Sequence, residues 1–130
     1  MSARISKKKS KNVPVAVLTI KVRDNNTFAT LTDSKGDVLK SISAGNAAVG
    51  FKHAKKGTPF AAGMVVEVAL KAAKEQFGVQ TIKCVKINGF AQGRESVYGP
   101  LRKSPITICD IICVTPIKHG GCRGKGQRRI

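Results

Sequence analysis

The chain has few acidic and few aromatic residues. Its 130 residues include 7 Asp and Glu against 24 Lys and Arg, a formal net charge of +17. Five Phe, one Tyr and no Trp are too few for a platform of exposed rings that stacks single-stranded bases. No apolar run reaches the roughly 18–20 residues of a membrane span, and no hydrophobic signal-peptide core lies near the start. We therefore expect no membrane partner, no secretion, and recognition through phosphates and RNA shape.

The positive charge is concentrated at the two ends. Neither residues 1–11 nor residues 118–130 contain an acidic residue, and their basic residues are Arg4, Lys7, Lys8, Lys9, Lys11, Lys118, Arg123, Lys125, Arg128 and Arg129. Repulsion among these positive charges does not stabilise a fold. Binding to a polyanion, in contrast, is favoured by the release of the polyanion's counterions. The pattern predicts a nucleic-acid partner. The basic start resembles a short transit peptide, but it runs directly into strand-like sequence, which favours an RNA-binding tail.

The length and the hydrophobic fraction of 42% predict one folded domain. We expect a basic N-terminal tail at 1–12, an α/β domain at 13–116 and a basic C-terminal tail at 117–130. The nearly continuous apolar residues 13–22 favour a strand covered on both faces. Short turns then separate strands at 27–33 and 38–43, which predicts an antiparallel meander.

Two crossovers follow the meander. A helix is expected from Pro59 to the stop at Gly78, with Thr58 as its N-cap. Its apolar stripe is expected at Phe60, Met64, Val68 and Ala72, and its many alanines permit close packing on a sheet. A strand at 81–88, a weaker helix that Gly99-Pro100 kinks or shortens, and a strand at 106–115 complete a three-layer mixed sheet.

Two loops could bind phosphate. The segment 44–57 is long, Gly-punctuated and basic, and Lys52, Lys55 and Lys56 lead directly into a helix N-terminus at Gly57-Thr58. Its residue order differs from that of a nucleotide-binding loop, so no nucleotide is expected. Gly93-Arg94 repeats the arrangement on the next crossover. The alternatives are a solvated basic loop for the first segment and a plain strand–helix turn for the second.

The cysteines and acids offer little chemistry. Cys84, Cys109, Cys113 and Cys122 form no CxxC pair, and buried structural thiols are expected. A zinc site from His119, Cys122 and another cysteine is disfavoured, because Cys109 and Cys113 lie about 13 Å apart if both are on one strand.

No nucleophile–base pair stands out, so we expect no enzyme, no cofactor, no metal and no small-molecule substrate. Two alternatives stay open. One is a nuclease using a metal at Asp24, Asp33 and Asp110, and the other is a protein that compacts any nucleic acid.

The C-terminal residues carry a family resemblance. Val-Thr-Pro at 114–116, His119, and Gly-Cys-Arg at 121–123 precede a basic tail, and Lys-Gly-Thr-Pro-Phe-Ala-Ala stands at 56–62. Asn25-Asn26-Thr27 and Gly93-Arg94 fit the same pattern. Over about residues 13–130 the chain resembles the bacterial form of the small-subunit ribosomal protein eleven (S11) family.

The resemblance implies a structural protein that binds small-subunit rRNA on the platform near the mRNA exit path. It implies a ribonuclease-H-like topology without catalytic carboxylates, contacts with neighbouring platform proteins, and a location on a ribosome of the bacterial cytoplasm or an organelle. A contact with mRNA near the exit site is a further option. The residues expected to contact rRNA are Lys7, Lys8, Lys9, Lys11, Asn25, Asn26, Thr27, Lys52, Lys55, Lys56, Gly57, Thr58, Arg94, His119, Arg123, Lys125, Arg128 and Arg129.

Three departures from the family pattern are present. Gly120 stands where Asn is usual, Gly124 and Gly126 stand where prolines are usual, and Gly99-Pro100 interrupts the second helix. The Gly99-Pro100 interruption puts contacts from Tyr98 to Lys103 in doubt, and the departures together suggest an organelle or a reduced genome.

Overall fold

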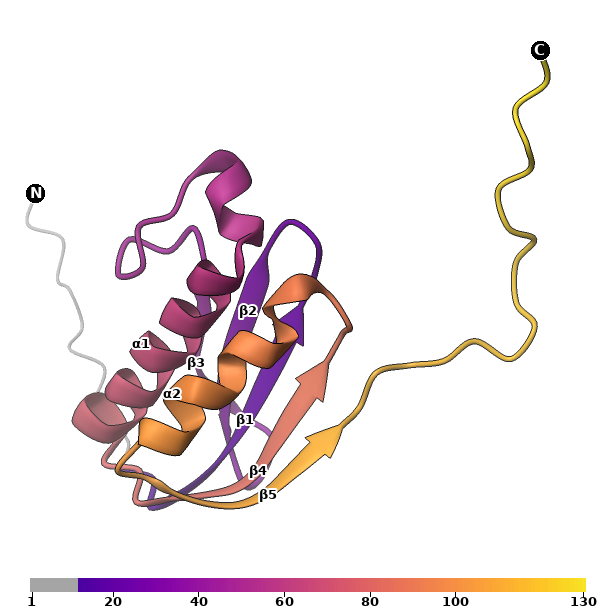
Figure 1. Cartoon of the computed structure of the whole chain (residues 1–130). Helices are drawn as coiled ribbons and strands as arrows, with labels where there is room; N and C mark the ends of the chain where they lie inside the picture. The colour runs from indigo at the N-terminus through magenta and orange to yellow at the C-terminus, as the bar shows by residue number, and fades with distance from the viewer. Residues whose placement is uncertain (1–11) are drawn as a thin grey trace, which may run out of the picture.

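A five-stranded mixed sheet forms the body of the protein (Figure 1). The computed structural model describes residues 12–130, so the expected tail contacts of residues 1–11 lie outside the described residues. In the order β3-β2-β1-β4-β5, β2 is antiparallel to β1 and β3, while β4 is parallel to β1 and β5. The strands are β1 (Val15–Val22), β2 (Thr27–Asp33), β3 (Val38–Ser43), β4 (Thr81–Asn88) and β5 (Thr107–Cys113). The predicted meander and crossovers are therefore confirmed.

Local turn chemistry sets several of the strand boundaries. Between β2 and β3, the Asp33 carboxylate accepts hydrogen bonds from the amides of Lys35 (2.9 Å) and Asp37 (3.0 Å), and Gly36 has a φ of 98°. Only Gly adopts such an angle readily. The second, third and fourth strands match their predicted bounds. The first begins at Val15 instead of residue 13, after Pro14, and the last ends at Cys113 instead of residue 115.

The long helix α1 (Pro59–Phe77) has the predicted ends. The Thr58 hydroxyl accepts from the Ala61 amide at 3.3 Å, and Gly78 ends the helix in the left-handed conformation with a φ of 62°. The expected apolar stripe was wrong: Phe60 is 69% exposed and Met64 and Val68 are only half-buried, although Ala72 is buried. The buried side of the helix is the one rich in alanine, because small side chains let α1 approach the sheet closely; its buried residues are Ala61, Ala62, Val65, Val66, Ala69, Leu70, Ala72 and Ala73.

The second crossover is a 3₁₀ helix, η2 (Gln92–Val97), followed by the short α-helix α2 (Tyr98–Lys103). Gly99 and Pro100 lie within the first turn of α2, where proline is tolerated. The α-helix is short, as predicted, and Leu101 is its buried residue, while Val97 is buried at the end of η2.

Both α-helices lie on the same face of the sheet (Figure 1), so the described residues form two layers, and the expectation of three was wrong. The crossovers β3–α1–β4 and β4–α2–β5 step across the sheet in the same direction. Right-handed connections then place both helices on one side. On β1, Leu18 and Ile20 face the helices and are fully buried, whereas Thr19 is half-buried and Lys21 is exposed. The expectation that this strand is covered on both faces was therefore also wrong.

Within residues 12–130, neither α-helix combines the length and the hydropathy that crossing a bilayer requires.

The packing predicts a large loss of stability on truncating the centre of the sheet. Leu18 has 0% exposure, so Leu18→Ala should lower the free energy of unfolding by about 3 kcal/mol, through lost burial and a residual cavity. Chemical denaturation measures this, and Val38→Ala, at 63% exposure on β3, is the control, with an expected change within about 0.5 kcal/mol. Similar losses for the two variants would contradict the described core.

Candidate nucleic-acid interface

Several loops gather at one end of the sheet, here named the loop end (residues 23–26, 44–58, 89–94 and 114–115). β1, β3, β4 and β5 point in the same direction, so the segments that follow them emerge together (Figure 1). The helix α1 also begins there. Ligands of open sheets with parallel strands generally bind at the carboxyl ends of those strands. The fold therefore brings together predicted contact segments that lie far apart in the sequence.

The turn 23–26 and the loop 44–58 form one unit. The Asn26 side-chain oxygen accepts from the amides of Thr27 (2.9 Å) and Ala44 (3.3 Å), and the Ala44 amide also donates to the Thr27 carbonyl at 3.2 Å. At the other end of the loop, a Cβ added to Gly57 would lie 2.5 Å from the carbonyl oxygen of Asp24. Only glycine permits such a close approach of the two backbones. The turn 23–26 therefore contacts the loop 44–58 at both ends, at Ala44 and at Gly57.

The loop 44–58 has a defined shape of its own. The Phe51 amide donates to the Ala44 carbonyl at 3.1 Å, and the Phe51 ring packs edge-on against Phe60 with centroids 5.8 Å apart. The 3₁₀ helix η1 (His53–Gly57) follows, starting with His53 at a φ of 54°. The Thr58 hydroxyl donates to the Lys55 carbonyl at 2.7 Å while it caps α1. This network positions the lysine backbones.

The loop lysines form a cationic group without ion pairs in the part of the chain that the structure describes. Lys52 and Lys55 are exposed, and Lys56 is half-buried against Gly45, where an added Cβ would lie 3.0 Å from the Lys56 Cε. Between residues 12 and 130 the one ion pair joins Lys71 to Glu67 on α1 at 3.2 Å. The loop lysines therefore have no carboxylate partner there, and the helix N-terminus beside them adds positive partial charge.

The structure gives three of the expected rRNA contacts, Asn25, Asn26 and Thr27, different surroundings. Asn25 is exposed, Asn26 is half-buried and bonded to backbone, and Thr27 is 2% exposed. The expectation that the Thr27 side chain faces a partner was wrong, because β2 begins there and alternation turns this residue toward the core. Gly57 offers backbone only, and its main role here is the contact with Asp24.

Arg94 connects the loop 89–94 to the end of β5. Its Nη1 donates to the Gly89 carbonyl at 3.1 Å and to the Cys113 Sγ at 3.4 Å, and its guanidinium lies 5.0 Å from the centre of the Phe90 ring. The hydrogen bond to Cys113 is the main cause that raises the pKa of Arg94 above its usual value. The sequence predicted a phosphate contact for Arg94 but no role for Cys113 or Thr115, because nothing local indicates this long-range contact.

Thr115 completes this group. Its hydroxyl accepts from the Gly89 amide at 3.0 Å and lies 3.3 Å from the Cys113 Sγ. The hydrogen bonds from Thr115, followed by the one from Arg94, lower the pKa of the Cys113 thiol to about 7. The start of the C-terminal segment is thus fixed to the loop 89–94.

Beyond Thr115 the chain extends away from the body without helix or strand (Figure 1). Its predicted contact residues are all exposed; they are His119, Arg123, Lys125, Arg128 and Arg129. Gly120 has a φ of 75°, a left-handed conformation that Asn also tolerates. Gly and Asn at this position therefore both allow this backbone conformation.

The acidic residues expected for a nuclease site do not come together. Asp24 follows the end of β1, whereas Asp33 pairs with Ala16 near its start, which places them roughly 20 Å apart along the strand. No group of three or more His, Cys, Asp or Glu suited to a metal occurs in the part of the chain that the structure describes. The metal site expected for the nuclease alternative, at Asp24, Asp33 and Asp110, is therefore not formed in the described residues.

The cysteines also differ from the expectation. Cys84 is buried as predicted, but Cys109, Cys113 and Cys122 are exposed. Cys109 and Cys113 lie on β5, which is an edge strand and pairs with one neighbouring strand only.

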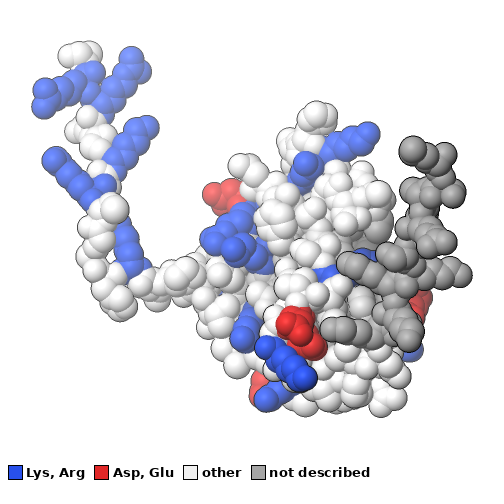
Figure 2. All heavy atoms as spheres, turned by 180° about the vertical axis from the view of Figure 1, so that it is seen from behind, with Lys and Arg blue, Asp and Glu red and all other residues white. Residues whose placement is uncertain are grey.

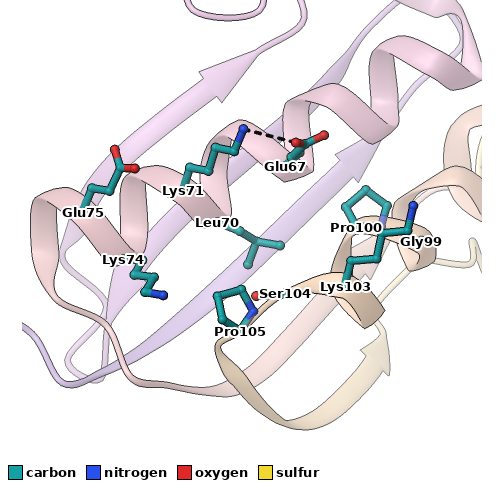
Figure 3. Close-up of a pocket in the computed structure, with 10 residues that line it drawn as sticks. All are labelled: Glu67, Leu70, Lys71, Lys74, Glu75, Gly99, Pro100, Lys103, Ser104 and Pro105. Carbon is teal, nitrogen blue, oxygen red and sulfur yellow. Dashed lines mark ion pairs between the residues drawn. The ribbon is translucent and has the colours of Figure 1, made fainter.

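A groove of about 370 Å³ between α1 and α2 lies away from the loop end (Figure 3). Leu70, Pro100 and Pro105 supply its apolar surface, and lysines and glutamates of α1 stand along its rim, including the pair Lys71–Glu67. Its charges are largely compensated, and we assign it no function.

Comparisons with known proteins agree with this arrangement. The sequence model of the family described as ribosomal protein S11 matches residues 16–129. The chain belongs to the ribosomal protein S11 family. The resemblance inferred from the motifs is confirmed by this match.

Curated relatives of the S11 family align over nearly the whole chain. A protein of Leptothrix cholodnii named small ribosomal subunit protein uS11 is 44% identical over 98% of this chain and 92% of its own length. Proteins of the same name from Rippkaea orientalis and Orientia tsutsugamushi (strain Boryong) are 43% and 38% identical, each over 96% of this chain and 93% and 96% of their own lengths.

The contacts of Cys113 predict its reactivity. Because its pKa is about 7, alkylation by iodoacetamide should reach half its maximal rate near pH 7, and Arg94→Ala should move that midpoint to higher pH by removing a donor to the thiolate. Mass spectrometry of the peptide containing Cys113 measures this. Arg102→Ala on α2 is the control and should leave the midpoint unchanged; an unchanged midpoint in Arg94→Ala would contradict the described contact.

Proposed function

We propose that this chain is a structural constituent of the small ribosomal subunit that binds small-subunit rRNA and has no catalytic activity. The observation that carries the proposal is the loop end, where Lys52, Lys55 and Lys56 lie on a loop held by the turn 23–26, beside Arg94 and the origin of a basic segment. A fixed group of cations without carboxylate partners suits the phosphates of a folded RNA backbone. The names of the relatives support the assignment to the small subunit.

The proposal extends to place and partners. We place the protein on the platform of the subunit, near the mRNA exit path, beside neighbouring platform proteins and within reach of mRNA. The named relatives are bacterial, which supports a ribosome of the bacterial cytoplasm, with an organelle as the other option.

Two structural features support the finer fold assignment. The strand order β3-β2-β1-β4-β5, with an antiparallel meander and two crossovers, is the basis for proposing a ribonuclease-H-like topology. The separation of Asp24 from Asp33 supports a version of it without a catalytic site. We also propose that residues 1–12 and 117–130 act as RNA-binding tails on a domain formed by 13–116.

The loop end predicts a position-specific loss of affinity. In the full chain, Lys55→Ala with Lys56→Ala should weaken binding to a transcript of small-subunit rRNA by about tenfold, because two fixed phosphate contacts are lost. Fluorescence anisotropy at fixed salt measures the dissociation constant. The matched control, Lys71→Ala with Lys74→Ala on α1, removes the same charge elsewhere and should cost less than about threefold. Equal losses would favour the alternative of a protein that compacts any nucleic acid, as would equal affinity for DNA.

Assembly into the subunit gives an independent prediction. A tagged copy expressed in a bacterial host should sediment with the small subunit in stoichiometric amount and remain there after a moderate salt wash. Migration as free protein, or spread over all nucleic acid and lost at modest salt, would contradict the proposal.

A further inference from the structure

On the face of the sheet opposite the helices, the two rows of side chains nearest the loop end are largely polar in the part of the chain described, with Phe28 and Ile112 as their exposed apolar members. Strand register places one row of side chains across four strands: Thr19 on β1 is directly opposite Thr30 on β2 and beside Lys86 on β4, and Thr30 is opposite Ser41 on β3. Successive side chains alternate between the faces of a strand, and the neighbours Ile20, Ala29 and Ile42 are buried under the helices. This row therefore faces away from the core.

A second row lies nearer the loop end. Lys21 is opposite Phe28 and beside Asn88, and Phe28 is opposite Ser43. Phe28 is 38% exposed and Lys21 is exposed. The two lysines stand on neighbouring strands one row apart, which places their Cα atoms about 8 Å from each other. Their flexible side chains can reach adjacent phosphates of one strand.

The two rows enclose a shallow hollow of about 420 Å³. It is lined by Thr19, Lys21, Phe28, Thr30 and Ser41, which contribute hydroxyl groups, an ammonium group and one ring. We name this surface, together with Lys86, the open face. Figure 2 views the molecule from this side, where most of the visible body surface is uncharged and Lys and Arg side chains stand on it in separate groups.

We propose that the open face binds a segment of RNA additional to the one at the loop end. This inference rests on the proposed function and deepens it by assigning a second contact surface on the same protein. Serine and threonine hydroxyls donate to phosphate oxygens and both donate to and accept from ribose 2′-hydroxyls, while the lysines neutralise phosphate. The single exposed ring of Phe28 accommodates one base or ribose instead of a stacked series.

The chemistry of the open face selects RNA over the other occupants. A packed protein helix would bury the hydroxyls of Thr19, Thr30 and Ser41 and the two ammonium groups against apolar side chains, leaving them without partners. The basic residues of segment 1–11 would be repelled by Lys21 and Lys86. Two residues of β5 oppose the pattern: Ile112, which is 46% exposed, is beside Lys86, and the acidic Asp110 is beside Cys84 in the next row away from the loop end.

The open face is continuous with the loop end. The row of Lys21 and Phe28 is the last full row before the turn 23–26, which holds the loop 44–58. An RNA strand bound by Lys52 and Lys55 can thus continue over the turn onto the sheet without leaving the protein surface.

The test compares two double variants of the full chain in the rRNA anisotropy assay. Lys21→Ala with Lys86→Ala should weaken binding about tenfold and reduce the slope of log K against log salt by roughly 1.5, since two phosphate contacts are lost. Lys71→Ala with Lys74→Ala is the control for charge. The affected lysines are exposed, and an unchanged thermal melting curve verifies folding.

The possible results separate the two proposals. If the native chain binds rRNA and Lys55→Ala with Lys56→Ala weakens it, but Lys21→Ala with Lys86→Ala changes neither affinity nor slope, the open-face inference is overturned while the proposed function stands. If the native chain shows no preference for rRNA, the proposed function fails first.

A photoreactive phenylalanine analogue at position 28 gives a second readout, in reconstituted small subunits. Cross-linking to rRNA is the expected result. Cross-linking to another protein or to residues 1–11 of the same chain, or no cross-link at all, would overturn the inference.

Discussion

Close backbone packing around the end of β1 is the constraint on which the loop end depends. A Cβ on Gly89 would lie 2.0 Å from the carbonyl oxygen of Val22, and one on Gly57 would lie 2.5 Å from that of Asp24. Gly93 likewise leaves no room beside Ala62 of α1. Three loops from distant parts of the sequence can therefore meet only because these positions lack side chains. The result is a surface whose cations are held by backbone contacts instead of by ion pairs.

The part of the fold that depends on local chemistry could be predicted from the sequence. Thr58 and Gly78 end α1 through their own hydrogen bonds and dihedral angles, and the turn at Asp33 needs only the residues that follow it. Features set by packing could not be predicted. The apolar stripe on α1 was misplaced because Phe60 and Met64 are more hydrophobic than the alanines that face the sheet. The covering of β1 was misjudged because its sequence does not say on which side the crossovers pass.

In the candidate site, too, features with a local sequence signal could be predicted, whereas features that depend on long-range packing could not. Charge and glycine spacing identified the loop 44–58 and the C-terminal segment without reference to structure. They could not tell that Thr27 is buried, that Asn26 is bonded to Ala44, or that Arg94 contacts Cys113, since each depends on segments distant in the sequence. The open face was also missed, although alternation gives a local signal for it: Thr19 and Lys21 are separated by the apolar Ile20, and Phe28 and Thr30 by Ala29.

The direction of the strands also determines where the two basic segments join the body. The Val13 amide donates to the Phe77 carbonyl at 2.9 Å, so the chain enters the fold beside the last residue of α1. The chain leaves the fold from the end of β5. This strand has the same direction as β1, because β4 is parallel to both. The two attachment points are thus at opposite ends of the sheet, roughly 25 Å apart for an eight-residue strand. Under the proposed function, an RNA bound by both segments must span the long axis of the domain, and the domain then fixes the distance between two stretches of phosphate backbone.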